Sequence, residues 1–86
     1  MVEIRKKCWH ELFNAILSGK KNFDLRLDDF QVKEGDILVL EEFNPKTKKY
    51  TGRKIEKRVN FVMKTKDLKF WSKKEIDKYG YIVIGF

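Results

Sequence analysis

The apolar residues of this chain repeat with two different periods, and those periods decide which elements it can form. From Trp9 to Leu17 they recur three and four positions apart, which places them on one face of a helix. Gly19 follows at the point where a helix commonly ends in a left-handed residue. The spacing predicts one amphipathic helix over about residues 9–18. Its apolar positions are Trp9, Leu12, Phe13, Ile16 and Leu17.

The other apolar residues alternate with polar ones or form short runs, as they do in β-strands. Asn22–Leu27 alternates, with Asp24 and Arg26 on the face opposite the apolar one. The remaining strand-like segments are a lead-in at 2–7, a continuous apolar run at 37–40, an alternating stretch at 54–63 and a last run at 81–84. We predict a long basic hairpin loop at Asn44–Gly52, because Asn44-Pro45 interrupts the apolar pattern.

A second, short helix is expected late in the chain. Ser72-Lys73-Lys74-Glu75 matches a capping box, in which a serine hydroxyl and a glutamate carboxylate satisfy free helix N–H groups. Gly80 ends this helix just before the last apolar run.

These elements predict an α+β fold and one domain over residues 1–86. A mass of 10.4 kDa allows only one modest core. Many short strands with few helices favour a small β-barrel of about five to six strands. The helix near the N-terminus and the short helix before the last strand would flank it. The last run at 81–84 leads us to expect a complete domain.

Several classes of protein are excluded by what the sequence lacks. No apolar run is long enough to span a membrane, and the N-terminus has no apolar signal core, so we expect a cytoplasmic protein. Cys8 is the single cysteine and has no partner for an internal disulfide. Cys8 and His10 are too few for a zinc site, so neither a metal nor a cofactor is expected.

The charge is concentrated in the second half of the chain. The net charge is +7, with −2 over residues 1–43 and +9 over residues 44–86. Such a basic half favours a polyanionic partner, most often nucleic acid. Sixteen of the twenty basic residues are lysine, which favours general phosphate attraction over base reading by arginine.

The candidate site is the stretch Gly19–Arg26. Lys21, Asp24 and Arg26 are expected to converge on one face, either as a surface ion-pair network of little energetic value or as a polar pocket. In a pocket, Arg26 would hold a phosphate or a base edge and Asp24 would accept from a base amine.

Further nucleic-acid contacts are expected around that pocket. Trp9 either stacks on a base or fills the core. The cations assigned to sequence-independent phosphate contact are Lys20 in the turn and Lys46, Lys48, Lys49 and Arg53 in the hairpin.

The same stretch carries a family resemblance. Gly19, Lys21, Asp24 and Arg26 stand in the pattern Gly-x-Lys-x-x-(Glu/Asp)-x-Arg. Directly after an amphipathic helix, this pattern resembles the signature of the ASCH domains, which are relatives of the PUA domain. Val32–Leu38 resembles the family's entry into a central strand. A prokaryotic and phage subfamily of unknown function within that superfamily is similar at Glu41–Arg53, in its long hairpin, and at Tyr81–Phe86, in its last strand.

The resemblance implies a PUA-like β-barrel with a cleft between the first helix, the Gly-Lys turn and the barrel, where RNA or a modified nucleotide would bind. It also implies an alternative, because a few small bacterial members hydrolyse the acetyl amide of N4-acetylcytidine. Those enzymes use a lysine matching Lys21 and a threonine at the position of Asp24. A carboxylate is a poor substitute for a hydroxyl nucleophile, although it can act as a general base on water.

We therefore expect an RNA- or nucleotide-binding module, monomeric and without a membrane partner, rather than an enzyme. The alternative is a small amidohydrolase on an N4-acylated cytidine, with Lys21 and Asp24 as its catalytic candidates. A second alternative is a protein-interaction domain that uses the basic hairpin.

Overall fold

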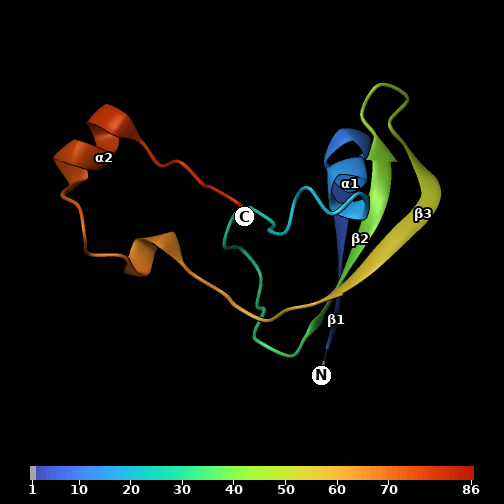
Figure 1. Cartoon of the computed structure of the whole chain (residues 1–86), viewed down its shortest axis with the longest axis horizontal. Helices are drawn as coiled ribbons and strands as arrows, with labels where there is room; N and C mark the ends of the chain where they lie inside the picture. The colour runs from blue at the N-terminus through green and yellow to red at the C-terminus, as the bar shows by residue number, and fades with distance from the viewer. Residues whose placement is uncertain (1) are drawn as a thin grey trace.

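The computed structural model describes residues 2–86 and centres on a three-stranded sheet (Figure 1). The sheet order is β1-β2-β3, where β1 is Glu3–Trp9, β2 is Ile37–Asn44 and β3 is Lys49–Arg58. β1 runs parallel to β2, with Glu3 opposite Ile37 and Trp9 opposite Phe43. β2 runs antiparallel to β3, with a register irregularity between Glu41 and Phe43.

β2 is the central strand because its sequence suits burial on both faces. Its Val39 and Leu40 are 0% and 2% exposed, in agreement with the continuous apolar run predicted for residues 37–40. Just before it, Asp36 is buried and its carboxylate accepts hydrogen bonds from the backbone N–H groups of Val2 and Lys33. This carboxylate therefore fixes the start of β2 to the start of β1.

Helix α1, His10–Leu17, packs one apolar face onto the sheet. Phe13 and Ile16 are buried against Cys8 and Leu40 and form the core cluster. Gly19 follows the helix with φ +83°, a conformation that only glycine adopts without strain. The predicted amphipathic helix is confirmed within one residue at each end.

The expected barrel is wrong: the sheet is open and has three strands. In the described residues, neither 22–27 nor 81–84 forms a strand. Leu25 and Leu27, predicted to face a core, are 68% and 81% exposed. The alternation predicts which side chains would share a face, but a strand also needs a partner for its backbone groups, which alternation does not specify.

The hairpin between β2 and β3 is also shorter than expected. Its turn comprises residues 45–48, with Lys48 at φ 57°, and β3 begins at Lys49 instead of near residue 54. β3 ends at Arg58, so the second half of the predicted strand, residues 59–63, is extended chain without ladder pairing beyond the bonds of Val59 to Gly35 and Asp36.

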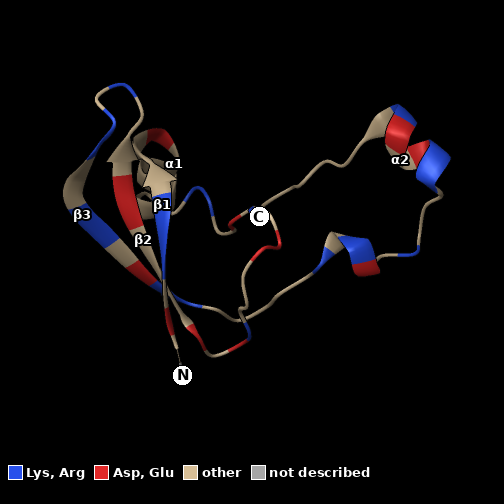
Figure 2. Ribbon diagram, turned by 180° about the vertical axis from the view of Figure 1, so that it is seen from behind, with Lys and Arg blue, Asp and Glu red and all other residues tan. Residues whose placement is uncertain are grey.

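Residues 59–86 leave the sheet as an extended arm (Figure 1). The arm carries a 3₁₀ turn, η1, at Thr65–Asp67 and helix α2 at Lys73–Tyr79. The capping box is confirmed, since the Ser72 hydroxyl accepts from the Glu75 N–H and the Glu75 carboxylate accepts from the Ser72 N–H. Basic residues lie on the β2–β3 turn and along β3, and α2 carries both signs of charge (Figure 2).

None of the helices in residues 2–86 combines the length and the apolar character needed to span a lipid bilayer.

Leu40→Ala should lower the free energy of unfolding by about 2–5 kcal/mol, because it leaves a cavity in the core cluster under α1. Leu17→Ala is the matched control, since Leu17 lies on α1 but is 58% exposed and outside the core cluster. Urea unfolding monitored by circular dichroism measures both variants. Equal destabilisation of the two variants would contradict the placement of the core.

Candidate functional site

The chain that follows α1 runs along the free edge of β1 and is fixed there by Arg26. Its Nη2 donates to the backbone carbonyl of Lys7 at 2.9 Å. Further along, the Lys6 ammonium lies 3.8 Å from the centre of the Phe30 ring. These contacts hold Arg26 and Phe30 beside β1, although the Gly19–Arg26 stretch forms no strand of its own.

Asp24 and Arg26 form a two-point ion pair. Arg26 Nε lies 2.5 Å from Asp24 Oδ2, and Nη2 lies 3.3 Å from Oδ1. Both side chains are about three-quarters buried, at 23% and 22% exposed, so the pair is better protected from solvent than an ordinary surface pair. Arg26 thus links the carboxylate to the edge of β1.

Lys21 lies at the start of the same stretch. Its backbone N–H donates to the carbonyl of Ala15 at the end of α1, and its Nζ donates to the Phe23 carbonyl at 2.6 Å. The ammonium also lies 4.7 Å from the centre of the Phe23 ring. The turn therefore presents a cation beside an aromatic face.

These side chains line an open cleft of about 550 Å³ between β1, α1 and the stretch, which we call the Trp9 cleft. Trp9 is 56% exposed, so it does not fill the core. The cleft is lined by Lys7, Cys8, Trp9, Leu12, Lys21, Phe23, Asp24, Leu25 and Arg26. The structure thus brings together four of the residues singled out in the sequence: Trp9, Lys21, Asp24 and Arg26.

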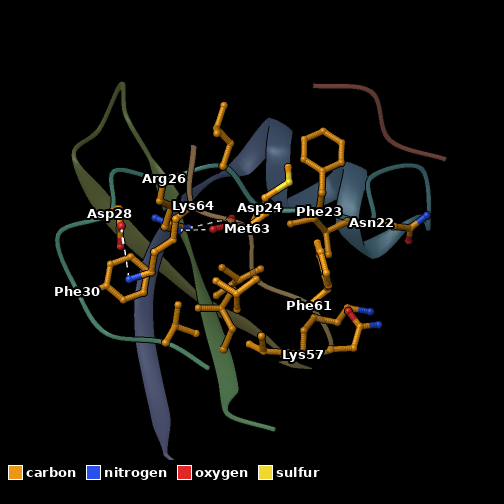
Figure 3. A pocket seen from close by; sticks show the side chains of 18 of the residues that line it. Asn22, Phe23, Asp24, Arg26, Asp28, Phe30, Lys57, Phe61, Met63 and Lys64 are labelled. Carbon is orange, nitrogen blue, oxygen red and sulfur yellow. Dashed lines mark hydrogen bonds and ion pairs between the residues drawn. The ribbon is translucent and has the colours of Figure 1, made fainter. Parts of the chain in front are cut away.

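A second hollow of about 560 Å³, the inner groove, lies on the side of the sheet that α1 covers in part (Figure 3). Ile16, Leu38 and Leu40 form its floor, and the segments 21–28 and 57–65 form its two walls. The Lys64 ammonium and the Asp28 carboxylate, 3.6 Å apart, join the walls. Lys21, Phe23, Asp24, Leu25 and Arg26 line both hollows.

Cys8 borders the Trp9 cleft but is poorly suited to nucleophilic chemistry. Burial is the main cause that raises the pKa of its thiol above 9.0, and the nearby Asp24 carboxylate adds to the rise. A protonated thiol is a weak nucleophile. Among the described residues, no three His, Cys, Asp or Glu side chains gather as metal ligands would.

The structure gives Arg53 a different role from the phosphate contact predicted for it. Its Nε and Nη2 donate to the two carboxylate oxygens of Glu42 at 2.8 and 2.7 Å, and Nη2 also donates to Asn14 Oδ1 at 3.0 Å. The guanidinium lies 5.0 Å from the centre of the Phe13 ring. Arg53 therefore joins the hairpin to α1.

Glu42 is the residue that the sequence reasoning missed. Its side chain is 4% exposed, and it also accepts a hydrogen bond from the Thr51 hydroxyl. A signal was present, because Glu42 continues the alternation of Leu38 and Leu40 on the buried face. The hydrogen bonds from Arg53 and then from Thr51 lower the pKa of Glu42 from 4.5 to about 2.

The remaining predicted cations lie outside both hollows. Lys20 is exposed on the turn after α1, next to the cleft-lining Lys21. Lys46 and Lys48 lie in the β2–β3 turn and Lys49 begins β3, and all three are exposed.

Comparison with protein families matches residues 5–86 to the domain of unknown function DUF3850. The match covers nearly the whole chain, and the chain belongs to that family. Comparison with the curated proteins and with the solved structures gives no significant match.

Glu42→Gln should lower the free energy of unfolding at pH values where the wild-type carboxylate is ionised. The folded-state pKa of Glu42 lies near 2 and its ordinary value is 4.5, so its stabilisation is complete above about pH 4.5 and is lost as the pH falls toward 2. Urea unfolding at several pH values should show a wild-type advantage over Glu42→Gln that shrinks through this window.

Glu56→Gln is the matched control, because it removes an exposed carboxylate from β3 and should keep the wild-type pH profile. A pH profile of Glu42→Gln that parallels wild type would show that Glu42 does not carry this dependence.

Proposed function

We propose that the Trp9 cleft binds a nucleotide or a short stretch of single-stranded RNA. The observation that carries the proposal is the half-exposed indole of Trp9 in one cleft with Lys21, Asp24 and Arg26. An aromatic face, cations and a carboxylate acceptor are the groups that bind a base and its phosphate.

Each side chain has a role in this proposal that its chemistry suits. Trp9 stacks on the base. Lys7 and Lys21 attract the phosphate. Asp24 accepts from a base amine, because a carboxylate has lone pairs beyond the two that Arg26 uses. Arg26 positions Asp24 and is anchored to the Lys7 carbonyl, so it acts within the cleft wall.

The charge distribution supports the same proposal. The net charge is +7, and the exposed lysines of the β2–β3 turn provide cations outside the cleft. Such cations attract a phosphate backbone without reading its sequence. The resemblance of Gly19–Arg26 to the ASCH signature points to the same class of ligand.

The hydrolase alternative has both of its catalytic candidates, Lys21 and Asp24, in the Trp9 cleft, but their contacts favour binding over catalysis. Both oxygens of Asp24 accept from Arg26, and burial raises the pKa of the nearby Cys8 thiol. The cleft therefore offers acceptors and cations for binding, and in hydrolysis Asp24 would serve only as a general base on water.

Trp9→Ala should weaken binding of short RNAs and nucleoside monophosphates by about 5- to 150-fold, the range expected when one base no longer stacks. Fluorescence or NMR titration measures the dissociation constants. Trp71→Ala is the matched control, because Trp71 is also half-exposed but lies on the arm, outside the cleft.

Equal affinities of wild type and Trp9→Ala would rule out stacking in this cleft. Addition of N4-acetylcytidine to the same samples tests the alternative, since release of cytidine that Lys21→Ala removes would identify a hydrolase.

Binding should weaken steeply as salt rises, because phosphate contacts release counterions. Replacing Lys46, Lys48 and Lys49 together by Gln should reduce the slope of log K against log salt by about 0.7 for each phosphate that these lysines neutralise. Titrations at several salt concentrations measure the slope. An unchanged slope would show that the β2–β3 turn does not contact the phosphates. A wild-type affinity that does not depend on salt would argue against phosphate binding altogether.

A further inference from the structure

The last six residues, Tyr81–Phe86, form an apolar segment that we call the C-terminal strap. Its large side chains range from about half exposed at Tyr81 and Val83 to fully exposed at Phe86. Within residues 2–86, no hydrogen bond joins the strap to another segment. Four consecutive residues of this kind, Tyr81-Ile82-Val83-Ile84, are costly to leave in water.

The walls of the inner groove have the same property. Leu25 and Leu27 on one wall and Phe61 and Met63 on the other are 62% to 81% exposed, and all four line the hollow. The groove therefore has an apolar floor and exposed apolar side chains on both walls, alongside charged ones such as Lys64 and Asp28.

One contact already places the strap at the end of this groove. An added Cβ at Gly85 would lie 2.6 Å from Cε1 and 2.7 Å from Cδ1 of Phe23, so only glycine lets the backbone come this close to the ring. At the other four glycine positions, a positive φ favours glycine. At Gly85, the close approach of the Phe23 ring favours a residue without a side chain. The strap passes the Phe23 end of the groove in Figure 3, and the C-terminus lies beside the chain after α1 in Figure 1.

We propose that the C-terminal strap closes over the inner groove of its own chain, pivoting on the Gly85–Phe23 contact. Closure places strap side chains such as Ile84 between the walls, near Phe61 and Met63, and removes both apolar surfaces from water. The occupant is the same chain, because the Gly85–Phe23 contact is made within it. The Lys64–Asp28 ion pair keeps the walls together at the other end.

Closure also bears on the Trp9 cleft, since Phe23 and Leu25 belong to both hollows. A strap packed on Phe23 would fix one wall of that cleft. The proposal itself does not rest on nucleotide binding, and its test requires no ligand.

Paired cysteines test the closure. Met63→Cys combined with Ile84→Cys should form an intramolecular disulfide under mild oxidation, detected as a faster-migrating monomer on non-reducing gels. Thr47→Cys with Ile84→Cys is the matched control and should stay reduced, because Thr47 lies in the β2–β3 turn outside the groove. Cys8 is retained, and Ile84→Cys alone shows whether this buried thiol reacts.

Adding Gly85→Val to the first pair should abolish the disulfide, because the larger side chain pushes the backbone away from Phe23. A disulfide-linked dimer would assign the groove to a second copy and overturn the proposal. Absence of any crosslink would overturn it as well.

Amide hydrogen exchange on the unmodified protein gives a second test. Residues 82–86 should exchange more slowly than a free chain, and their protection should not change on dilution. Exchange at the free-chain rate would contradict closure, and protection that disappears on dilution would indicate a second copy.

Discussion

The pairing of β2 on both of its edges is the constraint on which the rest of the structure depends. β2 supplies Leu40 to the core cluster under α1 and Val39 to the opposite face. Its partner β1 leads directly into α1, so the parallel pairing also sets the helix over the sheet. Asp36 strengthens this arrangement, since its buried carboxylate binds the N–H groups of Val2 and Lys33 at the start of the two strands. Without this pairing, α1 would be separated from the surface that buries its apolar face.

Two arginines extend this framework into the candidate site. Arg53 joins β3 to Glu42 on β2 and to Asn14 on α1, while Arg26 joins Asp24 to the free edge of β1. In each case, a guanidinium satisfies a carboxylate in two places and also binds a third group, which a lysine ammonium cannot do with the same planar geometry. Both arginines are therefore explained by the positions they hold, and of the cations predicted to contact phosphate only the lysines keep that role in the proposal.

The apolar surface of the molecule is distributed unequally. The sheet and α1 bury theirs, whereas the arm and the walls of the inner groove expose aromatic and branched side chains. Exposed apolar surface on this scale usually belongs to an interface. Here the two surfaces meet at Gly85 and Phe23, which is why we propose the strap of the same chain as the cover of the groove. The same movement would order Phe23, which lies between the groove and the Trp9 cleft.

Local patterns in the sequence were sufficient to locate three elements, two helices and the strand β2, although the pairing that stabilises β2 is not local. The three- and four-residue spacing from Trp9 to Leu17 specified α1, the pair Ser72 and Glu75 specified the start of α2, and the run at 37–40 specified β2. The convergence of Asp24 and Arg26 also follows from spacing, because residues two apart in an extended chain share a face. What only the tertiary structure decided was pairing: that 22–27 and 81–84 have no strand partner, that the sheet stays open, and that Arg53 meets Glu42 eleven residues away. Periodicity reports which side chains share a face, but backbone and charge partners depend on segments that sequence spacing does not bring together.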